Sequence, residues 1–168
     1  MLFFDSTPAV TLEAFDEDAA RLINPQTAAL LRKVELYCED AAQFPLPVRK
    51  FYDWENALRN SLLDIRKKSC PDAGMYKRNE PDFYSGIAAG AAQAAGTDDL
   101  LEAEKILDRM RWQALDDFGV GHYTDFTMLA FYRIRLLILR KYSVRTAAAG
   151  NQVLENILGQ LLNEDKTN

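Results

Sequence analysis

The chain has 168 residues and a mass of 19.0 kDa, and 48% of its residues are hydrophobic, so it can bury a core and is not a disordered chain. Twenty basic against twenty-five acidic residues give a formal net charge of −5, which argues against a general nucleic-acid binder. Cys38 and Cys70 form no CxxC pair, and one histidine cannot build a multi-histidine metal site. We therefore expect no cofactor, no metal and a reduced, cytoplasmic setting.

Helix start and stop signals divide the first third of the chain. Thr11 is a suitable N-cap for a helix over residues 12–22, and Asn24 with Pro25 begins a second one. We expect the second helix to run to about residue 42, with Pro45 and Pro47 ending it. Its predicted buried side consists of Leu30, Leu31, Val34, Cys38 and Ala41.

A third helix is expected over residues 48–69, because Phe51, Trp54, Leu58, Leu62 and Ile65 recur at spacings of three and four. Residues 70–81 contain the clearest break in the chain and read as a loop. We treat residues 1–168 as a single helical domain with a possible internal boundary at 70–81.

The fourth and fifth helices are expected over residues 82–95 and from a cap at Thr97 or Asp98 to about residue 117. In the fourth, Gly86 and Gly90 have the spacing that lets two helix backbones approach closely. The predicted buried side of the fifth consists of Leu100, Ala103, Leu107, Met110 and Ala114.

A sixth helix, expected over about 124–149, is apolar around most of its girth between residues 126 and 139, as a central bundle helix would be. This window also contains two arginines and is too short to span a bilayer, so we expect no direct membrane insertion. A last amphipathic helix follows Gly150, with a stripe of Val153, Leu154, Ile157, Leu158, Leu161 and Leu162. No strand-like alternation is visible, and the sequence predicts an all-α bundle of six to seven helices around the central one.

Polar residues beside the apolar stripe of the third helix are one candidate contact site. Asn56 and Asn60 lie four residues apart next to Trp54, and Glu55 and Arg59 have the spacing of a helical ion pair. Asparagine is a mediocre helix former, so two on one turn suggest hydrogen bonds to another helix, in the bundle or on a partner. A solvated polar flank is an equally good interpretation.

Charge is distributed unevenly along the chain. Five acidic residues precede the first basic one, whereas Arg133, Arg135, Arg140, Lys141 and Arg145 lie together late in the chain. Arg133 and Arg140 are seven residues apart and share a helix face. They would either bind an acidic partner or interact with the dipole of their own helix. The partner-binding candidates are Trp54, Asn56, Arg59, Asn60, Arg133 and Arg140.

His122 is the one side chain with acid-base potential near neutral pH. No GxSxG, HExxH or ExxH pattern supplies it with a nucleophile or an orienting carboxylate. We expect a structural role next to a helix start and no enzymatic activity. The alternative is a helical enzyme that uses His122 with a nearby carboxylate.

Several segments resemble, in their order, a family of uncharacterised bacterial proteins encoded among the subunits of V-type ATP synthases. These segments are residues 2–6 (LFFDS), 11–15 (TLEAF), 52–60 (YDWENALRN), 101–112 (LEAEKILDRMRW) and 122–124 (HYT), followed by the helix through Lys141 and Tyr142. The resemblance covers most of the chain.

That family is itself similar to the C (or d) subunit of rotary ATPases, an all-helical socket between the central stalk and the membrane rotor ring. The resemblance implies a non-catalytic helical adaptor whose partners are other ATPase subunits, in the cytoplasm and at the inner membrane only through those partners. A free-standing cytoplasmic regulatory or assembly factor is the alternative.

Overall fold

The computed structural model describes residues 2–4, 6–38, 40–67, 70–78 and 82–144, and these residues form helices and connecting segments without a strand. The expectation of an all-helical fold is confirmed. The elements in chain order are α1 (Leu12–Leu22), α2 (Pro25–Arg32), α3 (Leu46–Arg66), the 3-10 helix η1 (Pro71–Tyr76), α4 (Ile87–Ala95), α5 (Leu100–Phe118) and α6 (Phe126–Val144).

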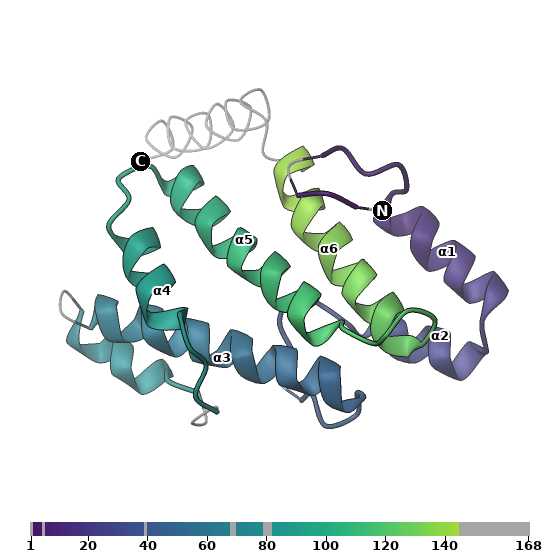
Figure 1. Cartoon of the computed structure of the whole chain (residues 1–168), viewed down its shortest axis with the longest axis horizontal. Helices are drawn as coiled ribbons and strands as arrows, with labels where there is room; N and C mark the ends of the chain where they lie inside the picture. The colour runs from purple at the N-terminus through teal and green to yellow at the C-terminus, as the bar shows by residue number, and fades with distance from the viewer. Residues whose placement is uncertain (1, 5, 39, 68–69, 79–81, 145–168) are drawn as a thin grey trace, which may run out of the picture.

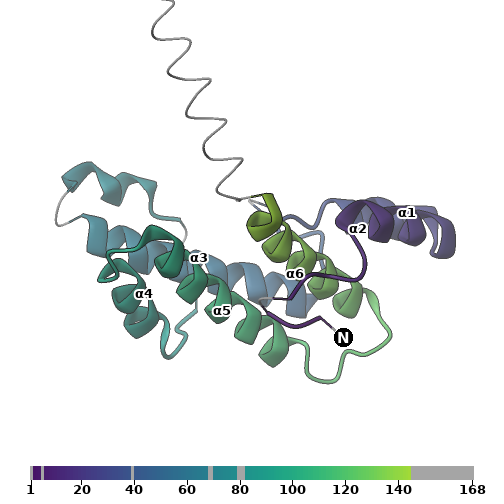
Figure 2. The same ribbon diagram turned by 90° about the horizontal axis from the view of Figure 1, so that it is seen from above.

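The long helices α5 and α6 run in opposite directions, and α3 extends across both of them (Figure 1). The helix α4 packs on α3 and α5 at one end of the molecule, while α1 and α2 pack on α6 at the other end. Seen from above, α3 runs from the end that carries α4 toward α6, and α1 lies beyond its end (Figure 2).

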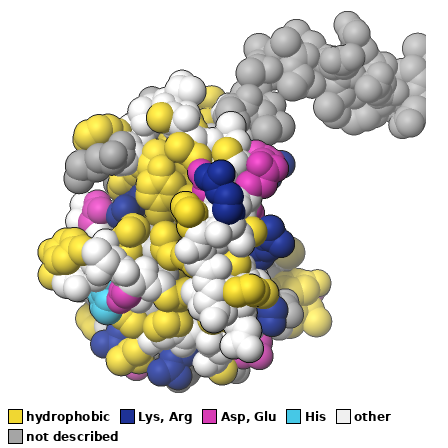
Figure 3. Space-filling model, turned by 90° about the vertical axis from the view of Figure 1, so that its right-hand side faces the viewer, with side chains coloured by type: hydrophobic (Ala, Val, Ile, Leu, Met, Phe, Trp, Pro, Cys, Tyr) yellow, Lys and Arg dark blue, Asp and Glu magenta, His cyan; other side chains and the backbone are white. Residues whose placement is uncertain are grey.

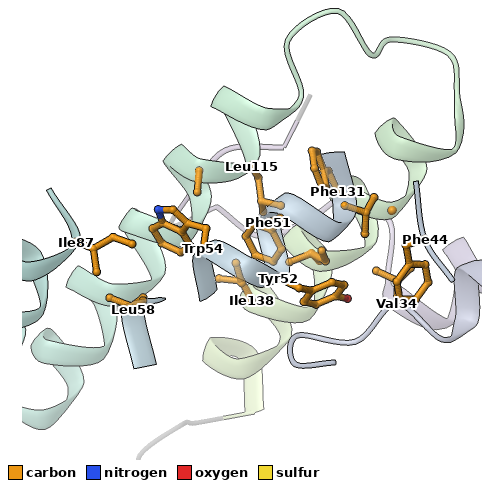
Figure 4. Close-up of a cluster of buried hydrophobic side chains, with 14 of the residues drawn as sticks. Val34, Phe44, Phe51, Tyr52, Trp54, Leu58, Ile87, Leu115, Phe131 and Ile138 are labelled. Atoms are coloured by element: carbon orange, nitrogen blue, oxygen red, sulfur yellow. The ribbon is translucent and has the colours of Figure 1, made fainter. Parts of the chain in front are cut away.

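The helix α6 is central, as its apolar girth predicts, because it contacts α1, α2, α3 and α5. Its side chains Phe131, Ile134 and Ile138 are almost completely buried. They join a core to which α3 contributes Phe51 and Leu58 (Figure 4). Residues 145–149 and the predicted last helix lie outside the described residues.

Two predicted N-caps are confirmed, and the cap of the fifth helix belongs to a different residue than predicted. Thr11 accepts a hydrogen bond from Ala14 N at 3.2 Å, and Asn24 accepts one from Gln26 N at 2.8 Å. The cap of α5 is Asp99, whose carboxylate accepts from Leu101 N at 2.9 Å, and not Thr97 or Asp98. The first turn of α6 is capped by Asp125.

The second helix is much shorter than predicted, because α2 ends at Arg32. Two side chains from other helices bind the backbone carbonyls just beyond it: Arg133 donates to Val34 O, and Tyr52 donates to Glu35 O at 2.7 Å. A backbone carbonyl that accepts a hydrogen bond from a distant side chain is already paired, so it does not require the N–H of a further helical turn. Val34 is nevertheless fully buried, so the apolar spacing was informative although the helix did not continue.

The two prolines expected to end the second helix lie at the start of α3. Pro45 is the N-cap of α3, and Pro47 lies in its first turn, where a missing N–H costs nothing. At its other end α3 stops at Arg66, and part of the predicted loop forms η1, which packs on α3.

The fourth helix starts at Ile87, five residues later than predicted. Gly86 precedes it with φ of 82°, a left-handed conformation in which glycine avoids the strain that a Cβ atom would bring. Only Gly90 of the predicted pair therefore lies in the helix, and a Cβ there would overlap the thioether of Met110. The close approach of α4 to α5 is confirmed at Gly90.

None of the described helices combines the length and the apolar composition that crossing a bilayer needs.

Candidate functional site

A groove of about 950 Å³ lies among α3, η1, α4 and α5. Its walls are mostly apolar, and Tyr37 from the segment after α2 completes one end. The exposed face of this groove includes Leu100, whose side chain is 85% exposed although the sequence predicted it to be buried. Leu100 is the first residue of α5, and it lies at the groove and not in the core.

Beneath the groove, Arg111 of α5 bonds to two carboxylates. Its Nε and Nη2 donate to the two carboxylate oxygens of Glu55 on α3, both at 2.9 Å, and its Nη1 donates to Asp108 at 2.8 Å. All three side chains are buried. Burial alone would lower the pKa of Arg111, but the charges and hydrogen bonds of these carboxylates raise it above its ordinary value.

The end of α6 joins the same network. Lys141 donates to Asp108 at 2.9 Å and to Glu104 at 2.6 Å, and the hydroxyl of Tyr142 donates to Asp108 at 2.7 Å. Glu55, on the other side, also accepts from Arg59 at 3.1 Å, as its helical spacing predicts. The network therefore connects α3, α5 and α6 through mutually paired charges, of which Glu55, Asp108 and Arg111 are buried and Lys141 and Glu104 are partly exposed.

The structure places the candidates of the third helix in different environments. Trp54 is only 8% exposed and stacks on Phe51, so it belongs to the core. Asn60 donates to Arg78 O at 3.3 Å and accepts from Arg78 N at 3.0 Å, so its partner is the segment after η1 and not another helix. Asn56 makes no side-chain hydrogen bond to the described part of the chain. Arg59 lines the groove with its guanidinium 3.5 Å from the ring centre of Tyr37.

The late basic residues bind acidic residues of this same chain. Arg133 donates to both carboxylate oxygens of Asp16 on α1, each at 3.0 Å, and Arg140 lies 3.3 Å from Glu13. Burial by itself would lower the pKa of Arg133, but Asp16 raises it above its ordinary value. Two members of the early acidic segment thus pair with two members of the late basic segment.

Basic and acidic side chains are accordingly interspersed on the face of the molecule that α1 helps to form (Figure 3). Arg135 of α6 pairs with Asp116 of α5, with a distance of 2.5 Å between the charged atoms. Burial nevertheless lowers the pKa of Arg135, and its Nε has no hydrogen-bond partner in the described structure. Arg145 lies outside the described residues.

His122 lies in the loop before α6, with its Nδ1 2.5 Å from Asp125 Oδ2. Desolvation acts against ionisation of Asp125, but the hydrogen bond from His122 prevails and lowers the pKa of this carboxyl. Asp125 also accepts from Met128 N at 3.1 Å, so the pair closes the N-terminus of α6. Neither residue lines the groove.

Residues that could hold a metal ion do not gather in the part of the chain that the structure describes. Asp108, Arg111 and Tyr142 were not among the candidates from the sequence, and Lys141 was considered only as part of the late basic run, although all four come from segments that carry the family resemblance. These residues are far apart in the chain, so the sequence did not show that they meet in one network. Comparison with protein families, curated proteins and solved structures gives no match.

Proposed function

We propose that this chain is a non-catalytic subunit or accessory factor of a V-type ATP synthase. It would act as a helical adaptor related to the C/d subunit of the central stalk and bind other subunits of the complex. Its place would be the cytoplasmic side of the membrane, reached through the central stalk and the rotor ring.

One observation carries the proposal: segments that resemble the ATPase-associated family meet at the buried network. Residues 52–60 supply Glu55, residues 101–112 supply Asp108 and Arg111, and the end of α6 supplies Lys141 and Tyr142. Charges used in internal pairs support a role in holding helices rigid, which an adaptor under load requires. They do not supply free groups for chemistry.

The test uses a chromosomally tagged chain in cells that make the ATP synthase. We expect the ATPase subunits to co-purify with it at a fixed stoichiometry, and deletion of its gene to dissociate the complex or to uncouple ATP hydrolysis from ion transport. A complex that lacks this chain and is intact and fully coupled would contradict the proposal. Substoichiometric, transient association would favour the free-standing regulatory or assembly factor.

A second candidate is a helical enzyme: His122 lies 2.5 Å from the carboxylate of Asp125, although neither residue lines the groove described above. A histidine held by a carboxylate can act as a general base. His122→Gln distinguishes the two candidates, because it would abolish an activity that depends on His122 but would leave assembly and coupling of the ATP synthase unchanged. Loss of coupling with the chain still folded would instead make His122 part of the adaptor surface.

A further inference from the structure

The groove described above is open and apolar in the part of the chain that the structure describes. Leu100 and Tyr76 line it and are 85% and 70% exposed. Exposed large apolar side chains along one groove are typical of a surface that receives an amphipathic helix. Its other apolar lining residues are Leu62, Leu63, Ile65, Ala94, Ala95, Ala103 and Leu107.

The charges around the groove favour an anionic occupant. Its lining contains Arg59, Arg66, Arg78 and Arg111 against Glu104. The network beneath adds Lys141 and the carboxylates of Glu55 and Asp108, so among the described residues five cations face three carboxylates. A positive excess around an apolar surface selects a helix with apolar and acidic faces.

The chain itself contains such a segment in residues 145–168. Between Thr146 and Asp165 it has three carboxylates and no basic residue. The sequence predicts an amphipathic helix there with the leucine-rich stripe given above. A helix this short is marginally stable in water, so its stripe needs a surface to pack against.

The C-terminal segment also matches the groove in position and in length. The C-terminal part of α6 is held at the groove by Lys141, whose Nζ lies 2.6 Å from Glu104. In a helix, the stripe from Val153 to Leu162 would extend about 14 Å, and the α5 wall from Leu100 to Arg111 extends about 16 Å. A covalently attached segment also has a high effective concentration near a surface it can reach.

We propose that the C-terminal segment of this chain docks as an amphipathic helix in the groove among α3, η1, α4 and α5. Its apolar stripe covers Leu100 and its neighbours, and its carboxylates face the arginines of the rim. The proposal concerns contacts within one chain and does not depend on the proposed function.

Cys70 provides a native probe, because it lines the groove and is exposed in the described residues. The test measures its rate of maleimide labelling by mass spectrometry in three full-length chains: the native one, Leu158→Asp/Leu161→Asp and the matched control Asn156→Asp/Asn163→Asp. Both variants add two negative charges, on opposite faces of the predicted helix. We expect labelling to be roughly tenfold faster only in the leucine variant, because labelling follows the fraction of chains with an open groove.

A substitution on the groove side provides an independent measurement. Leu100→Asp alters an exposed residue at the start of α5, where an acidic side chain suits the helix, so the fold should tolerate it. We expect this chain also to label faster at Cys70. Equal and fast labelling in all four chains would overturn the proposal and leave the groove to a partner. Protection that depends on chain concentration would also overturn it, since the occupant would then be the segment of a second copy.

Discussion

Arg111 is the residue on which the buried network most depends, because it bonds to Glu55 and Asp108 at once. The sequence contains a clue in the i, i+3 spacing of Asp108 and Arg111, but many helix surfaces have such pairs. The sequence did predict the contact of Glu55 with Arg59, because both lie on one helix. It did not reveal Glu55 as the partner of a residue 56 positions away.

Arg111→Met keeps the bulk of the side chain and removes its charge. We expect it to lower the free energy of unfolding by about 3 kcal/mol or more, because a buried carboxylate loses its partner. Urea denaturation measures the change. The control is Arg109→Met on the same helix, where an exposed arginine lies 3.6 Å from Glu102 and should contribute less than about 1 kcal/mol. Equal losses in the two variants would show that the network does not stabilise the fold.

The raised pKa of Tyr52 predicts that the folded chain loses stability at alkaline pH. Burial, followed by the nearby Cys38 and Glu35, raises the pKa of Tyr52 above its ordinary value of 10.0. A group whose pKa is higher in the folded state stabilises the fold below the unfolded pKa, and this contribution is lost as pH rises through and above 10.

Tyr52→Phe should therefore reduce the loss of stability above pH 10, and it should cost about 1 kcal/mol at pH 7 through the lost hydrogen bond to Glu35 O. Urea unfolding at both pH values measures the two effects. Tyr123→Phe, at an exposed tyrosine, is the control and should leave both values unchanged. An identical alkaline loss in native and Tyr52→Phe chains would contradict the prediction.

At the scale of helices, the late basic segment holds α1 on α6. Arg133 and Arg140 share a face, as their spacing predicts, and the acidic surface that they bind is α1. Periodicity identified each of these helices, but it could not say that residues 16 and 133 are neighbours. For the same reason it extended the second helix past Arg32, since the donors that occupy the carbonyls of Val34 and Glu35 come from α6 and α3.

Asp16→Asn should loosen α1, because it removes the charge that Arg133 binds with two hydrogen bonds. We expect a loss of roughly 2 kcal/mol in urea denaturation and faster amide hydrogen exchange confined to α1. Asp18→Asn is the matched control, since Asp18 pairs at the surface with Arg21 of the same helix. If the amides of α1 exchange equally fast in Asp16→Asn and Asp18→Asn, the pair of Asp16 with Arg133 does not hold α1 in place.

At the scale of the whole molecule, the fold itself engages several of the six partner-binding candidates, including Asn60, which donates to and accepts from the backbone of Arg78. Trp54 packs in the core, and Arg133 is buried against Asp16, so neither is available at the surface. Arg140 remains 54% exposed on α6, and Arg59 lines the groove. We place the proposed partner surface at Arg140, because the groove that Arg59 lines is the proposed position of the C-terminal segment.

Arg140→Glu should weaken co-purification with the ATP synthase and leave the unfolding free energy within about 0.5 kcal/mol of the native value, because the arginine is at the surface. Arg21→Glu, at an exposed position on α1, is the control for a simple change in net charge. Co-purification that falls equally in both variants would indicate a general electrostatic effect and not a specific contact at Arg140.

The sequence by itself determined the helical class, the central position of α6, the caps of α1 and α2, and a close helix approach at Gly90, although not that α5 is the partner. These properties depend on neighbours within one or two turns, which periodicity and capping chemistry describe directly. The tertiary structure decided where α2 stops, which carboxylate each arginine binds, and that Leu100 faces a groove. Each of these depends on residues that are distant in the chain and become neighbours only when the helices pack.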